Sequence, residues 1–300
     1  MLSVIIPVYN EEKAISSTVS ELKKVLQIQN FDFEIIVVND GSIDKTKVMI
    51  ESYLKTLNNR NRTYIKVINH PHNMGYGAAI KTGLKIARFE NCAIIDADAT
   101  YDPKQLVELF RVKQELEYEM VVGMRTGHFY KGSKGKQTLR FILRKIVEYM
   151  TGRSIPDINS GARVFDRSVA MGNLRILSDK FSFTTSLTLV FMMRNCFVRY
   201  EPINYFGREG KTKVKIFSDS LRTLGFILSV AAFFNPVRIF FPIVLLIVFF
   251  GIGIGILALI ESSWNLFILS SLILLTSTLV FSIGIMSHII GFKLGDKETL

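Results

Sequence analysis

The chain has 300 residues, of which 49% are hydrophobic, and its formal net charge is +11 at pH 7. Most of the charge lies early: 35 of the 37 Lys and Arg residues and 23 of the 26 acidic residues precede residue 239. No nucleic-acid-binding motif accompanies the basic charge, so we expect no nucleic-acid partner. The two cysteines, Cys92 and Cys196, are far apart and in apolar surroundings, as is typical of reduced cytosolic thiols.

Strand and helix patterns alternate along the first hundred residues. Three apolar, β-branched runs predict strands: residues 3–8, 34–39 and 64–68. A fourth strand ends at Asp96, and helices are expected to open at Asn10 and to cover residues 78–88. This alternation predicts an α/β fold with a doubly wound, mostly parallel sheet, which binds its ligands at the C-terminal ends of the strands.

Two carboxylates follow the fourth strand, at Asp96 and Asp98. Acids at positions i and i+2 lie on the same side of an extended backbone, so both can face one cation. Mg²⁺ or Mn²⁺ held by one or two carboxylates usually completes its shell with substrate phosphates. The pair therefore predicts a divalent metal and a diphosphate substrate, the alternative being two solvated turn acids.

Other polar groups and glycines also follow predicted strands. Asp40 can accept hydrogen bonds from a ribose or a base, or it can simply form an Asp-Gly turn. Gly75 and Gly77 can let the backbone approach a ligand, but the dinucleotide fingerprint is absent after the first strand, which argues against a nicotinamide enzyme. Asp102 is expected to cap a helix that has a proline in its first turn.

Basic and aromatic side chains characterise the next part of the chain. Arg140 and Arg144 stand four residues apart on a predicted amphipathic helix, whose basic face can lie on a membrane, receive a phosphate or remain solvated. Polar residues gather around a glycine in the loop 157–163, and residues 201–213 offer a segment with cations for phosphate capture. The aromatic residues of the segment 181–183 are expected to pack in the core.

The last part of the chain is nearly uncharged. Residues 239–260 and 266–290 are runs of 22 and 25 residues without Asp, Glu, Lys or Arg. Each is long enough to cross a hydrocarbon core of about 30 Å, which predicts a helical hairpin; two buried helices of a soluble core are the alternative. Basic residues flank the two runs: Arg238, Lys293 and Lys297. The positive-inside rule then places both termini and the basic domain in the cytoplasm of a multi-pass cell-membrane protein.

Six motifs occur in an order that resembles family 2 glycosyltransferases of the A-type fold, and among them the polyprenyl-phosphate group that includes dolichyl-phosphate mannose synthase. The motifs are residues 4–12 (VIIPVYNEE), 38–42 (VNDGS), 73–77 (NMGYG), 96–98 (DAD), 160–163 (SGAR) and 208–213 (REGKTK). Each motif alone is common, but the ordered set is specific and extends over residues 3–213. The resemblance and the two uncharged runs together divide the chain into a cytoplasmic glycosyltransferase domain (1–213), a juxtamembrane amphipathic segment (214–238), two transmembrane helices (239–290) and a cytoplasmic tail (291–300).

The resemblance also implies roles for individual residues. The nucleoside site comprises Pro7, Tyr9, Glu11 and Asp40. The diphosphate and metal site comprises Asp96 and Asp98, with Arg208 and Lys213 closing on the phosphates, and Asp98 and Arg208 are the implied catalytic residues. The acceptor-phosphate site comprises Arg125, Arg140 or Arg144, and Ser160.

These expectations define an inverting transfer of a sugar from a UDP- or GDP-sugar to a membrane polyprenyl phosphate, dolichyl or undecaprenyl, at the cytoplasmic face. A phosphate acceptor, whose second pKa is about 6, is already largely ionised and needs no general base. A hydroxyl acceptor on a glycolipid or polysaccharide would need one, for which Asp157 is the candidate. The third alternative is a non-catalytic, membrane-anchored protein that binds nucleotide sugars. Residues 99–103 depart from the pattern of dolichyl-phosphate mannose synthases, which leaves the sugar and the nucleobase open. A homo-oligomer is compatible with the sequence.

Overall fold

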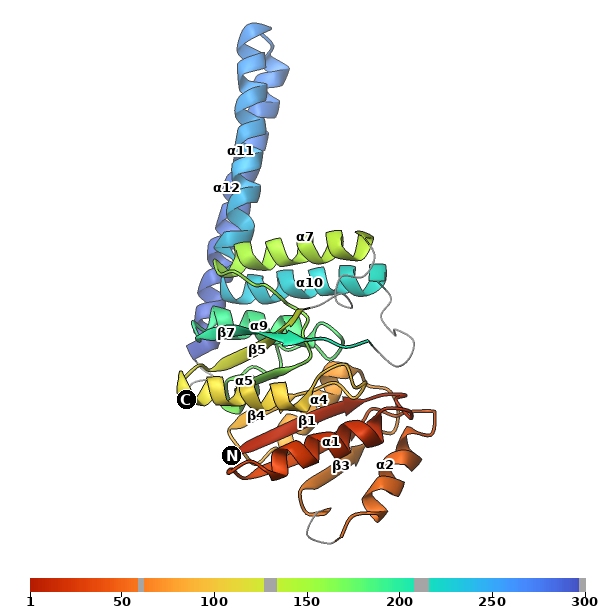
Figure 1. The fold of residues 1–300 in the computed structure, drawn as a ribbon. Helices are drawn as coiled ribbons and strands as arrows, with labels where there is room; N and C mark the ends of the chain where they lie inside the picture. The colour runs from red at the N-terminus through yellow and green to blue at the C-terminus, as the bar shows by residue number, and fades with distance from the viewer. Residues whose placement is uncertain (59–61, 127–133, 208–215, 297–300) are drawn as a thin grey trace. The chain divides into compact units, whose positions relative to one another are not determined.

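The structure is a computed structural model that describes residues 1–58, 62–126, 134–207 and 216–296 (Figure 1). It divides into two compact units, Met1–Phe226 and Ile227–Leu300.

The first unit is built on a seven-stranded sheet with the strand order β3-β2-β1-β4-β6-β5-β7. Its strands are β1 (Leu2–Val8), β2 (Phe33–Asn39), β3 (Ile65–Asn69), β4 (Asn91–Ile94), β5 (Met120–Thr126), β6 (Arg163–Asp166) and β7 (Val198–Asn204). The strands β3, β2, β1 and β4 pair in parallel, as do β5 and β7, whereas β6 is antiparallel to both β4 and β5. The predicted α/β fold with a mostly parallel sheet is confirmed, and the fully buried β1 and β2 have the continuous apolar sequences expected of central parallel strands.

Eight helices of the described chain follow or connect these strands. They are α1 (Ile15–Gln27), α2 (Thr46–Lys55), α4 (Tyr76–Ile86), α5 (Pro103–Glu115), α7 (Lys134–Thr151), α8 (Arg167–Met171), α9 (Phe183–Met193) and α10 (Ile216–Phe234). Helix α1 begins at Ile15 and not at Asn10, because Asn10 has a positive φ of 52°, which is incompatible with a right-handed helix. Helix α5 begins as predicted: the Asp102 carboxylate accepts a hydrogen bond of 2.8 Å from the backbone N–H of Lys104.

The second unit contains α11 (Val237–Ile260) and α12 (Trp264–Asp296), two helices long and apolar enough to cross a membrane. Only 11% of each apolar span is buried, which argues against core helices of a soluble protein. The two helices pack closely where Ser270 donates a hydrogen bond of 2.8 Å to the carbonyl of Gly251. The connection between the helices is shorter than the five residues, 261–265, that separate the two uncharged runs, because α12 already begins at Trp264.

Candidate active site

The sheet register brings three polar segments together. Ile94, the last residue of β4, pairs with Ile5 of β1 on one side and with Arg163 of β6 on the other. Since β1 and β4 are parallel and β6 is antiparallel, the segments that follow β1 and β4 meet the loop that precedes β6. The 4–12, 96–98 and 160–163 motifs therefore converge at one edge of the sheet.

The Asp96 carboxylate is held from two sides. The Tyr76 hydroxyl donates a hydrogen bond of 2.8 Å to Asp96 Oδ1. On the other side, a Cβ on Gly161 would lie only 2.2 Å from Asp96 Oδ2, so the absence of a side chain at Gly161 makes room for the carboxylate. Burial raises the pKa of Tyr76 well above its usual value, and the negative charge of Asp96 adds to this shift. Tyr76 therefore stays protonated and acts as a hydrogen-bond donor.

Asp98 is buried, and its Oδ1 atom accepts hydrogen bonds from the hydroxyl and the backbone N–H of Thr100, at 2.6 and 3.3 Å. The turn between the two residues requires a positive φ of 56° at Ala99. No group of three or more His, Cys, Asp or Glu side chains placed to hold a metal occurs within the described residues. Asp96 and Asp98 supply hard oxygen ligands of the kind that Mg²⁺ or Mn²⁺ takes when it shares its shell with a substrate phosphate.

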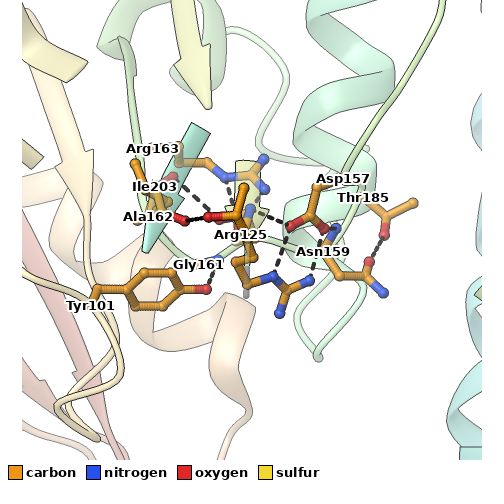
Figure 2. A network of polar contacts seen from close by, with 11 residues as sticks. Tyr101, Arg125, Asp157, Asn159, Gly161, Ala162, Arg163, Thr185 and Ile203 are labelled. Atoms are coloured by element: carbon orange, nitrogen blue, oxygen red, sulfur yellow. Dashed lines mark hydrogen bonds and ion pairs between the residues drawn. The ribbon is translucent and has the colours of Figure 1, made fainter. Parts of the chain in front are cut away.

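Arg125 and Asp157 form a buried ion pair (Figure 2). Arg125 Nε donates to Asp157 Oδ2 and Nη2 donates to Oδ1, both at 2.8 Å. Asp157 also accepts hydrogen bonds from the backbone N–H groups of Arg125 and Asn159, at 3.1 and 3.2 Å. The ring of Tyr205 lies against the guanidinium, with its centroid 5.4 Å from Cζ.

Burial would raise the pKa of Asp157, but the positive charge and the hydrogen bonds of Arg125 outweigh burial, and the pKa lies below its usual value. Asp157 is therefore a weak base whose two oxygens already accept hydrogen bonds. This arrangement makes it the counter-ion of Arg125, contrary to the role of general base considered for a hydroxyl acceptor.

The predicted binding residue Ser160 and its motif neighbour Arg163 serve the protein's own packing. Ser160 is fully buried and its hydroxyl lies 3.5 Å from the carbonyl of Ala162, so the structure gives no support to a contact with an acceptor phosphate. Arg163, in the same motif, is also fully buried and donates to the carbonyl of Thr184 at 2.9 Å. The 160–163 motif thus joins β6 to α9 and, through the Gly161 N–H, contacts the Tyr101 hydroxyl at 2.8 Å (Figure 2).

Asp40 organises the loop that leads into α4. Its carboxylate accepts hydrogen bonds from the backbone N–H groups of Met74 and Gly75, at 2.9 and 2.8 Å, and lies 2.8 Å from His70 Nδ1. The side chain is only 3% exposed. In this structure the Asp40 carboxylate therefore holds the loop before α4 in place.

The glycines of the 73–77 motif face the chain itself. A Cβ on Gly75 would lie 2.3 Å from the carbonyl oxygen of Asp179, and one on Gly77 would lie 2.1 Å from that of Ser178. The backbone N–H of Ala78 donates a hydrogen bond of 3.0 Å to the same Asp179 carbonyl. The expectation that these glycines admit a ligand is therefore corrected: they admit the segment that precedes α9.

This segment also changes the interpretation of residues 181–183. Phe183 is fully buried, as predicted. Phe181, however, is 45% exposed and stacks on the ring of Tyr76, with ring centroids 5.7 Å apart and an interplanar angle of 15°. Tyr76 lies inside the 73–77 motif but was not among the predicted site residues, because its contact with Asp96, 20 residues later, is not visible in the sequence.

The remaining predicted residues lie in several environments. Pro7 is buried in β1, while Tyr9 and Glu11 are half-buried in the segment that follows. Arg144 is half-buried on α7, where its guanidinium lies 5.4 Å from the ring centroid of Phe141. The side chain of Arg140 and the residues Arg208 and Lys213 lie outside what the structure describes.

Helix α7 buries one apolar stripe, but its other face is not simply basic, because large apolar side chains are exposed on it. Its buried residues are Leu143, Val147 and Met150, and its exposed residues include Phe141, Ile142, Lys145 and Tyr149.

Several known proteins are similar to this chain. Dolichyl-phosphate beta-glucosyltransferase ALG5D of Trichomonas vaginalis is 32% identical over 179 residues, which cover 55% of this chain and 53% of that protein. Dolichyl-phosphate beta-glucosyltransferase of Dictyostelium discoideum is 25% identical over 236 residues, or 74% and 71% of the two chains. Dodecaprenyl-phosphate galacturonate synthase of Rhizobium johnstonii is 28% identical over 152 residues, or 51% and 42%. The chain spans about half the length of the first curated relatives it matches.

Solved structures with the same fold include glucosyl-3-phosphoglycerate synthase of Mycobacterium tuberculosis, crystallised with Mn²⁺, UDP and phosphoglyceric acid. Its TM-score is 0.60, with 16% sequence identity, and the match covers 77% of this chain and 78% of that one. A family model described as glycosyl transferase family 2 matches residues 3–172, more than half of the chain. On this match, and with the fold and the convergent motifs in agreement, the chain belongs to glycosyl transferase family 2.

Proposed function

We propose that this protein transfers a sugar, with inversion, from a nucleoside diphosphate sugar to a polyprenyl phosphate in the membrane. The observation that carries the proposal is the pair of carboxylates, Asp96 and Asp98, at the sheet edge where the family motifs meet. Relatives that are named for dolichyl-phosphate and dodecaprenyl-phosphate reactions support the lipid acceptor. The structural neighbour that was crystallised with UDP makes UDP-sugars the first donors to test.

Asp96 and Asp98 would hold a divalent cation together with the donor diphosphate. When bound, Mg²⁺ or Mn²⁺ supplies positive charge that stabilises the departing nucleoside diphosphate. The protein's contribution is positional: both carboxylates are oriented by hydrogen bonds within the chain, Asp96 by Tyr76 and Asp98 by Thr100. Preorganised charge of this kind needs no rearrangement during the reaction.

A phosphate acceptor fits the acid–base groups better than a hydroxyl does. Asp157, the carboxylate considered as a base, is committed to Arg125 and has a lowered pKa. A phosphate that is already ionised can attack without proton removal. Arg125 is the cation that we assign to the acceptor side, with Arg144 and Arg140 on α7 as further candidates.

The two apolar helices would anchor the enzyme beside its lipid substrate. Arg238 and Lys293 lie just outside the uncharged runs 239–260 and 266–290 of these helices, and we infer from them that both termini and the family 2 domain face the cytoplasm. The negatively charged lipid surface would also attract the positively charged domain.

The test uses the full chain in lipid vesicles with UDP- and GDP-sugars, and compares a short polyprenyl phosphate with the matching polyprenol. We expect a glycosylated phospholipid, identified by mass, that forms only with Mg²⁺ or Mn²⁺. The variant Asp98→Asn should lose transfer, whereas Asp102→Asn is the matched control, because asparagine caps a helix as well as aspartate does. Glycosylation of the polyprenol but not of its phosphate would contradict the proposal, as would full activity of Asp98→Asn.

A further inference from the structure

Asp96 is oriented by the side chain of Tyr76, a residue to which the family resemblance assigns no role. Tyr76 is the first residue of α4, and its hydroxyl donates to Asp96 Oδ1 at 2.8 Å. Gly161 closes the opposite side, since a Cβ there would lie 2.2 to 2.7 Å from the three carboxyl atoms of Asp96. The carboxylate is thus confined between the start of α4 and the loop before β6.

Tyr76 in turn is supported by the segment before α9. The ring of Phe181 stacks on the Tyr76 ring at a centroid distance of 5.7 Å. Phe181 remains 45% exposed, so burial in the core does not explain its position. Phe183 packs in the core, whereas Phe181 stacks on Tyr76.

Three further contacts attach this segment to α4 and to the residues just before it. The Asp179 carbonyl accepts the Ala78 N–H at 3.0 Å, and the Asp179 carboxylate pairs with Lys81 Nζ at 2.7 Å. Lys180 Nζ donates to the carbonyl of Met74 at 2.8 Å. The segment therefore holds the start of α4 from outside, which fixes the place of the Tyr76 ring.

We propose that Tyr76, supported by Phe181, is a positioning residue that orients Asp96 toward a divalent cation bound with the donor diphosphate. The inference rests on the proposed function, because that function places the cation at Asp96. Partners that hydrogen-bond to metal ligands fix the direction of the ligand atoms, and their removal typically lowers metal affinity by about 10- to 100-fold. A neutral phenol suits this role, since it orients the carboxylate without cancelling its charge.

The test measures Mn²⁺ binding to the full chain in detergent, in the presence of saturating UDP, by the electron paramagnetic resonance signal of free Mn²⁺. Tyr76→Phe keeps the ring and removes only the hydroxyl, and we expect its dissociation constant for Mn²⁺ to rise about tenfold or more. Phe181→Leu should shift the constant in the same direction, and Phe181→Tyr should restore the wild-type value. Transfer by Tyr76→Phe should recover at high Mn²⁺.

The matched control is Tyr53→Phe on α2, because no described residue forms a hydrogen bond with the buried Tyr53 hydroxyl. It removes the same atom away from Asp96 and should leave Mn²⁺ affinity unchanged. Equal Mn²⁺ affinity in Tyr76→Phe and the wild type would overturn the positioning role while leaving the proposed function intact. If the wild type showed no Mn²⁺ binding with either UDP or GDP, both the inference and the metal-dependent function would be overturned.

Discussion

The buried pair of Arg125 and Asp157 allows stability and function to be separated in a double-mutant cycle. Arg125→Met removes the guanidinium and leaves a carboxylate that is 1% exposed; Asp157→Leu leaves a guanidinium that is 11% exposed. Removal of one partner from a buried ion pair typically costs about 3–5 kcal/mol, because the other charge is left uncompensated. For a unit of the size of Met1–Phe226, each kcal/mol lowers the Tm by roughly 2–4 °C, so each single variant should lose roughly 6–20 °C.

The double variant should be more stable than either single variant. Replacement of a buried ion pair by apolar residues is often neutral or stabilising. Two backbone donors, the N–H groups of Arg125 and Asn159, would still lose their acceptor, at about 1–3 kcal/mol for each unsatisfied group. If Arg125 binds the acceptor phosphate, the double variant should recover stability without recovering transfer.

A thiol-reactive fluorescent dye provides the unfolding assay. Cys92 in β4 is fully buried, and burial raises its pKa to about 12, so the thiol should react only when the domain unfolds. The partly exposed Cys196 would give a background signal, which a Cys196→Ser parent chain removes. A double variant as unstable as the worse single variant would refute the uncompensated-charge explanation.

The pH dependence has a defined sign. The folded-state pKa of Asp157 is lowered, so its contribution to stability is present above the unfolded value of about 3.9 and is lost as the pH falls through the folded value. The difference in Tm between the wild type and Asp157→Leu should therefore be full at neutral pH and shrink in strong acid. A difference that grows on acidification would contradict the assigned ion pair.

Two further predictions concern the same unit. Gly77→Ala would place a Cβ 2.1 Å from the Ser178 carbonyl oxygen, and we expect the free energy of unfolding, measured with the same dye, to fall by about 1–3 kcal/mol. The control is Gly172→Ala, whose Cβ would lie 3.4 Å from its nearest neighbour, and its stability should stay near that of the wild type. Glu34→Gln should lower the Tm at neutral pH and have less effect at pH 3. Burial would raise the pKa of Glu34, but the charge of Lys66 and the hydrogen bonds from Lys66, Arg88 and Ser3 outweigh burial and lower it. An equal loss of Tm at both pH values would contradict this.

The fold could be predicted well from the sequence because its strands are short apolar runs and its helices carry regular apolar stripes. The stripe of α1 is buried as expected, at Ile15, Val19, Leu22 and Leu26. Its start could not be placed, since the positive φ of Asn10 depends on contacts with residues more than 30 positions later, such as the Ser42 hydroxyl that accepts the Asn10 N–H. Local helix propensity does not depend on such long-range contacts, so it cannot predict them.

The candidate site was predicted only in part, for a similar reason. Asp96 and Asp98 were found because acids at a strand end form a local pattern. Tyr76 and Phe181 were not, because their relation to Asp96 exists only after α4 and the segment before α9 meet. Asp157 was the candidate base only for a hydroxyl acceptor, and its ion pair with Arg125 could not be foreseen because the two residues are 32 positions apart.

The contacts of the motif residues explain why the motifs indicate a reaction class more clearly than a substrate. Gly75, Gly77 and Gly161 are required where the chain approaches itself or the Asp96 carboxylate, and Arg163 ties β6 to α9. These residues place the carboxylates on a rigid framework, which any donor diphosphate could use. Discrimination between sugars must then depend on side chains that line the site without forming the framework. Variation in those side chains would alter the donor while leaving the motifs unchanged, which is why a sequence can match the family closely and still leave its sugar undetermined.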